Sequence, residues 1–331
     1  MAHQFVIAAI ALGAAFCYAA SNVIEQRKAS TAPPETSLRI ALLWYLARQP
    51  IWWLGIGVDL GGFGLQVLAL GLGTLVFVQP LLVTSLLFSL LLGAAARTLR
   101  LSWSDLGWAL VFMASLSVFL VEAAPSGGVD QRDLRAWALP MAIVAGLVLI
   151  CIALSRRVPG GYRAAALAAG AGMTFGVSST LMKSFAHELG ADGMTGMLGH
   201  WEPYALGLII AIGFLVLQSA FQAGDLRGAL PFLEVSEPVV ASVLGLTLMH
   251  ERLHAIDGAA KAVVAASAVL MVLSAGVLAR STAQAREPVG TPPEPPARPD
   301  RAPTRAPAPS DRPRPVPPDQ RPSWTRGRTA T

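Results

Sequence analysis

Residues 229–249 read ALPFLEVSEPVVASVLGLTLM, an apolar run that carries two carboxylates, Glu234 and Glu237, and two prolines. A helix that crosses the hydrocarbon of a bilayer needs roughly 20 predominantly apolar residues, at a rise of about 1.5 Å each. Carboxylates inside such a helix are costly unless they meet a partner or a water-filled path. The stretch therefore predicts a membrane-spanning helix with functional residues in its interior.

Similar apolar runs fill most of the chain, which has 331 residues, 54% hydrophobic and 14% charged, with a mean hydropathy of +0.55. A soluble domain carries roughly 25% charged residues. The first run lacks the preceding basic residues of a signal peptide, so we expect it to stay as a helix. We expect an all-α membrane protein with about nine transmembrane helices, at residues 4–24, 51–72, 74–96, 103–121, 136–154, 163–182, 203–221, 229–249 and 256–279.

The charges of the loops predict the orientation. With the N-terminus outside, the inner loops carry ten basic residues and the outer loops carry four. Lys and Arg resist translocation, so they accumulate on the cytoplasmic side. An odd number of spans also places the basic C-terminal segment inside. We therefore expect a multi-pass protein of the plasma membrane, with its N-terminus outside and its C-terminus cytoplasmic.

Residues 283–331 form a Pro/Arg-rich segment that we expect to be a disordered cytoplasmic tail. From Arg286 onward it holds nine Arg, five acidic residues and fourteen Pro. It has no apolar periodicity, so it cannot bury enough surface to offset its chain entropy. Most of the formal net charge of +5 lies in this tail, so the basic balance does not indicate a nucleic-acid partner. The alternative is that the tail docks a protein or lipid headgroups.

The chain contains an internal repeat. Gln79-Pro80-Leu81-Leu82 recurs 158 residues later as Glu237-Pro238-Val239-Val240. Residues 9–14 resemble residues 166–171 at an offset of 157, although Ala-rich helices match one another easily. Two distant segments that agree on nearly the same offset are better evidence than either alone.

The repeat pairs each of the first four spans with a span five positions later, which crosses in the opposite direction. We therefore expect an inverted repeat (4 + 5), with halves at residues 1–124 and 125–282 and with the fifth span unmatched. Leu65-Gln66 also recurs as Leu217-Gln218, if a gap is allowed. Inverted repeats present similar gates to the two membrane faces, which favours transport by alternating access.

The second half runs from Gly228-Ala229-Leu230-Pro231 to the ending Leu248-Met249-His250-Glu251-Arg252-Leu253. It resembles the EamA-type repeats of the drug/metabolite transporter superfamily, which have a similar ending. The first half, with Trp52-Trp53-Leu54-Gly55 and Val78-Gln79-Pro80-Leu81, is similar to the NIPA-type magnesium transporter branch. The resemblance covers residues 5–279. It implies a transporter of magnesium, another divalent ion or a small metabolite. Gly93-Ala94-Ala95-Ala96 departs from the pattern, because it stands where a second Glu motif would fall.

Three carboxylates are the main candidates for a substrate pathway. Asp59 lies about eight residues into its predicted span, or roughly 12 Å deep, and Glu237 has the same nominal depth in its own span. Glu234 is three residues from Glu237 and shares its helix face. The alternative for Glu234 is a hydrated position at the membrane interface. The trio suits a divalent cation, a cationic metabolite or a proton relay, and Asp59 and Glu237 would be the metal ligands if the substrate is a divalent cation.

Four glutamines within or close to predicted spans are further pathway candidates. They line a pathway or simply form hydrogen bonds between helices, and the sequence favours neither reading. They are Gln66, Gln79, Gln218 and Gln222.

Several other polar residues lie at predicted span ends. Glu251 and Arg252 are expected to form a gate or an ordinary helix-end pair. Glu25 is expected to be hydrated, and the tryptophans, Trp137 among them, are expected to form an interfacial belt.

No nucleotide-binding or hydrolytic motif is present in the sequence, so we expect no cofactor and no enzymatic activity. The leading hypothesis is a secondary transporter that moves a small solute or ion by alternating access. The alternative is a non-transporting scaffold or lipid-handling membrane protein that uses its basic Pro-rich tail to recruit partners. The expected partners are the lipid bilayer and the small substrate, and a homodimer is left open.

Overall fold

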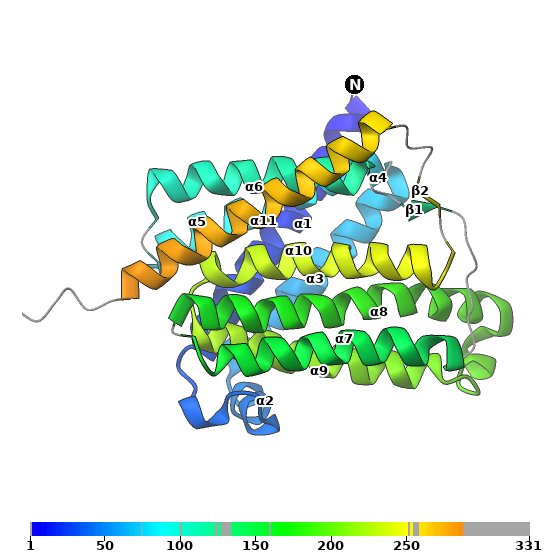
Figure 1. Ribbon diagram of the computed structural model, residues 1–331, viewed down its shortest axis with the longest axis horizontal. Helices are drawn as coiled ribbons and strands as arrows, with labels where there is room; N and C mark the ends of the chain where they lie inside the picture. The colour runs from blue at the N-terminus through cyan, green and yellow to red at the C-terminus, as the bar shows by residue number, and fades with distance from the viewer. Residues whose placement is uncertain are drawn as a thin grey trace, which may run out of the picture. The chain divides into compact units, whose positions relative to one another are not determined.

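The computed structural model describes residues 2–73, 75–99, 101–122, 125–126, 134–158, 160–250, 252–253 and 258–286. Its elements, drawn in Figure 1, are helices joined by short loops and one two-stranded pairing. They are α1 (Ala2–Ala29), the 3₁₀ turn η1 (Pro34–Thr36), α2 (Ile40–Ala47), α3 (Pro50–Leu72), α4 (Leu75–Leu82), α5 (Ser85–Ala95), α6 (Trp103–Glu122), β1 (Pro125–Ser126), α7 (Leu134–Ser155), α8 (Gly160–Met197), α9 (Glu202–Ala223), α10 (Leu226–Thr247), β2 (Arg252–Leu253) and α11 (Gly258–Arg286).

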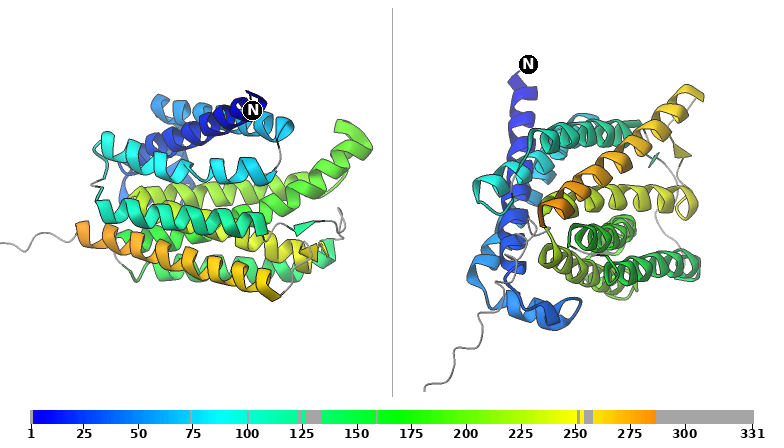
Figure 2. Two further views of the ribbon diagram at one scale, coloured as in Figure 1. Left: turned by 90° about the horizontal axis from the view of Figure 1, so that it is seen from above. Right: turned by 60° about the vertical axis from the view of Figure 1, so that its left-hand side comes forward.

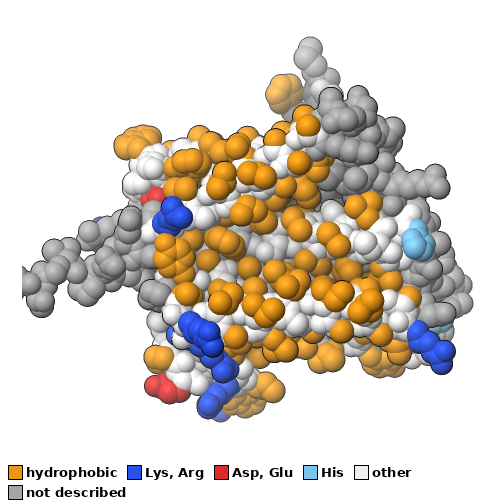
Figure 3. Space-filling view, in the orientation of Figure 1, with side chains coloured by type: hydrophobic (Ala, Val, Ile, Leu, Met, Phe, Trp, Pro, Cys, Tyr) orange, Lys and Arg blue, Asp and Glu red, His pale blue; other side chains and the backbone are white. Residues whose placement is uncertain are grey.

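Nine segments within the described residues are long and apolar enough to cross a membrane, which confirms the predicted number of spans. Figure 3 shows the same pattern on one face, where apolar side chains cover the middle of the helices and charged side chains gather toward their ends. The chain is therefore a multi-pass, all-helical membrane protein. Residues 283–286, predicted to be part of the disordered tail, belong instead to α11. The rest of the predicted tail, residues 287–331, lies outside the described residues.

Helix α8 is the central span. Of its spanning window, 72% is buried inside the protein, against 17% for α3 and for α7, which therefore face the lipid. α8 packs most extensively on α10 and α9 and also contacts α7, while α1 packs on α3, α5, α4 and α9 (Figures 1 and 2). Two helices of the chain, α1 and α8, thus each organise a group of neighbours.

The third span, Phe77–Ala95, agrees with the span predicted at residues 74–96, but two helices form it instead of one. α4 ends at Leu82 and α5 begins at Ser85, with a turn at Val83 and Thr84. Pro80, inside α4, has no backbone N–H for the helical ladder. The Thr84 hydroxyl donates to the Leu81 carbonyl at 2.6 Å and helps to close the turn. Broken helices at membrane depth are a recurrent feature of transporter binding sites.

Two elements differ in length from the prediction. α8 extends to Met197, well beyond the span expected at residues 163–182. The loop after α1 contains the additional short helix α2, whose Leu42 and Leu46 are buried. The span of α8, Gly161–Met182, still agrees with the predicted span.

The loops meet one another in two separate groups. At one end, β1 pairs antiparallel with β2, Ser126 opposite Arg252, and this joins the loops after α6 and α10. At the other end, Gln222 at the C-terminus of α9 donates to the carbonyl oxygen of Pro33, in the loop after α1, at 2.8 Å. Arg163 at the start of α8 donates to Ser37 of the same loop at 3.2 Å. These groupings agree with nine alternating spans.

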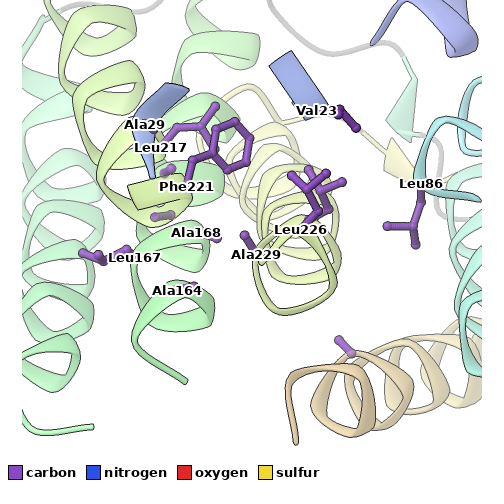
Figure 4. Close-up of a cluster of buried hydrophobic side chains, with 14 of the residues drawn as sticks. Val23, Ala29, Leu86, Ala164, Leu167, Ala168, Leu217, Phe221, Leu226 and Ala229 are labelled. Carbon is purple, nitrogen blue, oxygen red and sulfur yellow. The ribbon is translucent and has the colours of Figure 1, made fainter. Parts of the chain in front are cut away.

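The largest apolar core joins helices from both ends of the chain. It includes Val23 of α1, Leu86 of α5, Phe221 of α9 and Leu226 of α10 (Figure 4). Small residues such as Ala168 let the backbones approach closely within it. Because lipid tails are as apolar as these side chains, the core stabilises the fold through close van der Waals packing.

Candidate functional site

Tyr18 lies at the contact between α1 and α3. Its hydroxyl donates a hydrogen bond to Gln66 Oε1 at 2.6 Å. A Cβ atom added at Gly62 would lie 3.3 Å from the Tyr18 ring and 3.1 Å from Cys17 Cβ. The glycine therefore lets the two helices approach, and the ring packs against its backbone. Gln66, one of the predicted pathway residues, forms a hydrogen bond between helices.

The three predicted carboxylates all lie within electrostatic range of Tyr18. Asp59 approaches it from α3, and Glu234 and Glu237 approach it from α10. Tyr18 is about eleven residues from Ala29, the C-terminal end of its span, which corresponds to roughly 16 Å along the helix. Each member of the predicted trio therefore lies within electrostatic range of one residue of α1.

On α10, Glu237 is half-buried and accepts a hydrogen bond from the Ser179 hydroxyl of α8 at 3.0 Å. Glu234 is also half-buried and interacts electrostatically with Glu237. Pro238 removes the N–H that would bond the backbone carbonyl of Glu234 in a regular helix. This helix turn therefore offers two carboxylates and a carbonyl oxygen that is free of its usual helical donor.

Two glycines of α8 hold this turn of α10 in place. A Cβ atom added at Gly172 would lie 2.5 Å from the carbonyl oxygen of Leu233, and one at Gly176 would lie 2.6 Å from that of Glu237. Real Cβ contacts are essentially never this short. The α8 and α10 backbones therefore approach as closely as they do only because both positions are glycine.

Glu25 is buried, so the expectation that it is hydrated at a span end is wrong. Its side chain is 4% exposed, and α1 continues past it to Ala29. The Ser21 hydroxyl donates to Glu25 Oε1 at 2.9 Å, and Gln218 Nε2 of α9 donates to Glu25 Oε2 at 2.5 Å. Asp59 is close enough to interact with it electrostatically. The carboxylate is retained inside the protein because both of its oxygens are hydrogen-bonded.

The two remaining predicted glutamines are Gln222 and Gln79, and neither forms a hydrogen bond with the carboxylates among the described residues. Besides Pro33, Gln222 donates to the Ala32 carbonyl at 3.2 Å and to Thr36 Oγ1 at 3.3 Å, so it anchors the loop after α1. The side chain of Gln79 is half-buried on α4.

The predicted gate has no side-chain geometry, because Glu251 lies outside the described residues and Arg252 is described only through its backbone pairing in β2. The described residues include no group of three or more His, Cys, Asp or Glu arranged to hold a metal ion. Asp59, Glu234 and Glu237 therefore do not form a preassembled three-carboxylate metal centre.

The carboxylates have no basic partner among the described residues. In the described part of the chain, no Lys or Arg forms an ion pair with Glu25, Asp59, Glu234 or Glu237. Buried charges normally have a partner, since an isolated ion in a medium of low dielectric constant is costly. The arrangement suits a positive guest, which is a metal ion, an organic cation or protons.

Two members of the site were missed in the sequence. Tyr18 aligns with Phe175 in the sequence repeat, so the first half has a hydroxyl group where the second half has an apolar ring. That difference could have marked Tyr18 as a candidate. Glu25 stands one residue beyond the predicted end of its span. Its partner Gln218 is 193 residues away, and no local pattern announces that contact.

Comparison with known proteins gives one informative relative. The chain is 31% identical over 251 residues to an uncharacterized protein of Corynebacterium glutamicum, and the match covers 75% of this chain and 86% of that protein. No protein-family model matches the chain, and no solved structure matches it.

Proposed function

The chain belongs to the family of this uncharacterized Corynebacterium glutamicum protein, and we propose that it is a secondary transporter that moves a small cation by alternating access. The observation that carries the proposal is that Asp59, Glu234 and Glu237 lie within membrane-spanning helices and form no ion pair with a described Lys or Arg. Intramembrane carboxylates without a basic partner mark substrate or proton pathways in membrane proteins. The proposed activity is transport and not enzymatic catalysis.

The contacts among the helices support the inverted repeat on which alternating access depends. α1 packs on α3 as α8 packs on α9, and α1 packs on α4 and α5 as α8 packs on α10. The fourth spans of the two halves, α6 and α11, pack on each other. Helix α7, which has no counterpart in the repeat, packs mainly on α8.

One pair of contacts supports the repeat at the level of residues. Tyr18 of α1 packs on Gly62 of α3, and a Cβ atom added at Gly213 of α9 would lie 2.9 Å from the Phe175 ring of α8. Tyr18 and Phe175 are related by the offset of 157, and the two glycines are related by nearly the offset of Gln66 and Gln218. An aromatic ring against a glycine thus recurs at the same helix contact in each half.

The orientation and the superfamily are part of the proposal. The excess of basic residues in the loops that include Arg39 and Arg163 supports a cytoplasmic side at the end where Gln222 lies. The short motifs around Gln79-Pro80 and Glu237-Pro238 support membership of the drug/metabolite transporter superfamily, and a divalent cation such as magnesium fits the NIPA-type likeness.

The ligands that the site offers set the range of cargo. Magnesium retains several waters and needs only one or two carboxylates from the protein, which Asp59 and Glu237 would supply. A small organic cation would use the same carboxylates and pack against Tyr18 by a cation–π contact. Both classes share a positive charge, and the experiment must separate them.

The proposal is tested in two steps on the purified full chain. A thermal-shift screen against magnesium chloride, other divalent chlorides and small organic cations finds ligands, because a binder stabilises the folded state in proportion to the logarithm of its concentration. Each hit is then assayed for uptake into proteoliposomes. Concentration-dependent stabilisation by a cation, followed by saturable uptake, supports the proposal. Stabilisation only by anions or lipids, with no uptake of any cation, contradicts it.

A further inference from the structure

Glu25, Ser21 and Gln218 form a hydrogen-bonded polar group that lies closer than Tyr18 to the end of α1 that is proposed to be cytoplasmic. All three are buried, with exposed fractions of 4%, 1% and 0%. Glu25 is about four residues before Ala29, or roughly 6 Å along the helix from its end. Nothing in the transport of a cargo held by Asp59 and Glu237 requires a second buried carboxylate at this level.

The space around Glu25 is provided by a glycine. A Cβ atom added at Gly55 of α3 would lie 3.1 Å from Glu25 Cγ and 3.1 Å from Ile24 Cγ2. The stem of Glu25 therefore packs directly on the α3 backbone. The carboxylate beyond it meets only donors that can rotate, which are the Ser21 hydroxyl and the Gln218 amide.

The Gln218 amide is satisfied on one side only. Its Nε2 donates to Glu25, while its Oε1 is buried and accepts no hydrogen bond from a described residue. A buried acceptor without a donor is unfavourable. The amide NH2 and oxygen have nearly the same size and shape, so rotation by about 180° exchanges them without a change in volume. The rotated amide presents Oε1 to Glu25, and this oxygen accepts a hydrogen bond only if the carboxyl carries a proton.

The groups that face Glu25 fix which ion fits. Asp59 of α3 is the other titratable group within its electrostatic range, and Gln218 of α9 and Ser21 of its own helix are neutral. Arg27 and Lys28 follow on α1, and neither forms an ion pair with it among the described residues. Glu25, Ser21 and Gln218 are all buried, so they leave no room for the waters that magnesium retains when it binds to one or two carboxylates. A proton needs no further ligand and no added space.

We infer that Glu25 binds the coupling proton of the transporter, with Gln218 as the amide that bonds both its ionised and its protonated form. A proton from the adjacent aqueous side joins a Glu25 oxygen and neutralises the carboxylate. Gln218 then changes from donor to acceptor. The coupling of this proton to transport rests on the proposed function, whereas proton binding by Glu25 does not.

The position of this hydrogen bond explains how a proton would affect the closure of the two proposed halves. Glu25 belongs to the first half and Gln218 to the second, so their hydrogen bond joins α1 to α9. The next residue, Gln26, makes a parallel link from its Nε2 to the Gly224 carbonyl at 3.1 Å. Protonation of Glu25 replaces a charged hydrogen bond by a weaker neutral one. This weakens the closure of the two halves at this end.

The test is infrared difference spectroscopy of the full chain in proteoliposomes, titrated with pH in H2O and D2O, which needs no transported substrate. The protonated-carboxyl band of Glu25 should be lost in Glu25→Gln, and it should shift in frequency in Gln218→Leu and Ser21→Ala. Gln66→Leu, which removes the repeat-related glutamine, is the matched control and should leave the band unchanged. Spectra of Glu25→Gln that superimpose on those of the wild type overturn the inference.

Two further measurements keep the outcomes distinct. If Glu25→Gln does not fold, a band that neither Gln218→Leu nor Ser21→Ala shifts overturns the inference equally. Titrations in sodium chloride and choline chloride should give the same band, and its loss on addition of sodium at constant pH contradicts a proton site. A wild type that transports no cation yet retains the Glu25 band contradicts the proposed function alone.

Discussion

The guanidinium of Arg227 lies 2.9 Å from Asp105 Oδ2, and each side chain is only 4% exposed. The pair joins the first turn of α6 to the first turn of α10, and Asp225 adds a second carboxylate at 3.6 Å from Arg227. Asp105 also caps α6, since its Oδ2 accepts from the Ser102 N–H while the Ser102 hydroxyl accepts from the Asp105 N–H. This buried ion pair links α6 to α10.

Removal of either partner of this pair should destabilise the protein strongly. We expect Arg227→Met to cost about 3–5 kcal/mol, because it removes one partner of a buried ion pair. The double variant Asp105→Leu with Arg227→Met should lose less stability than the sum of the single variants. Thermal unfolding in detergent, arranged as a double-mutant cycle, measures the coupling. Additive losses would show that the pair contributes no specific interaction.

Asp59→Asn and Glu237→Gln should each abolish cation flux while the protein still folds. Each change keeps the size of the side chain and removes the charge that attracts the cargo. Glu35→Gln is the matched control, because Glu35 is an exposed carboxylate in the loop after α1. Flux into proteoliposomes, with size-exclusion profiles as the check on folding, is the measurement. Normal flux by both site variants would remove these residues from the pathway.

Tyr18→Phe tests whether the hydroxyl at the centre of the carboxylates has a role beyond packing. The phenylalanine keeps the ring on Gly62 and loses only the hydrogen bond to Gln66, so we expect a loss of about 1 kcal/mol in stability. Gln66→Leu should cost a similar amount, and the double variant little more than either single one. We also expect Tyr18→Phe to reduce cation affinity and Gln66→Leu to do so less. Equal affinities in both variants and the wild type would assign Tyr18 to packing alone.

The spans could be predicted from the sequence because a bilayer imposes a length and a composition on each of them. The run at residues 136–154, for example, differs from α7 by only a few residues at its ends. The break at Val83 and Thr84 was not predicted, because a proline does not by itself end a helix: Pro80 precedes the break, but Pro238 lies inside the unbroken α10. Depth along the predicted spans selected Asp59, Glu234 and Glu237 as candidates, and the structure places all three within long apolar helices.

The missed features depend on contacts between distant segments. Glu25 was placed outside its span because it is charged, and only the donor Gln218 from another helix makes its burial tolerable. Trp137 was expected in an interfacial belt, but it is completely buried, and its ring packs edge-on against Trp201 at 6.1 Å between centroids. Asp105 and Arg227 form an ion pair although they lie far apart in the chain. Local sequence patterns indicate the depth of a residue in a span and the periodicity of a helix, but they do not identify which distant side chain it contacts.

Gly172→Ala and Gly176→Ala should separate α8 from α10. The added methyl groups would meet backbone carbonyls at 2.5 and 2.6 Å, and backbone cannot rotate away as a flexible side chain can. We expect each variant to lose about 1–3 kcal/mol and to lose flux, because the turn that holds Glu237 is displaced. Gly61→Ala is the control, since its Cβ would meet nothing within 4 Å and alanine favours a helix by about 1 kcal/mol. A similar stability in all three variants would show that the helices have room to adjust.

Deletion of residues 288–331 separates a carrier from a scaffold. The described helices belong to a unit that ends at Glu287, so the truncated chain retains every one of them. A transporter whose pathway runs through Asp59 and Glu237 should keep the cation flux of the full chain, because both residues lie in the retained unit. A protein whose activity is the recruitment of a partner by a basic Pro-rich tail should instead lose its cellular phenotype. Flux in proteoliposomes and complementation in cells are measured in parallel, with Asp59→Asn as the opposite control. A truncated chain that keeps the phenotype, together with an Asp59→Asn variant that loses it, supports the carrier, and the reverse pattern supports the scaffold.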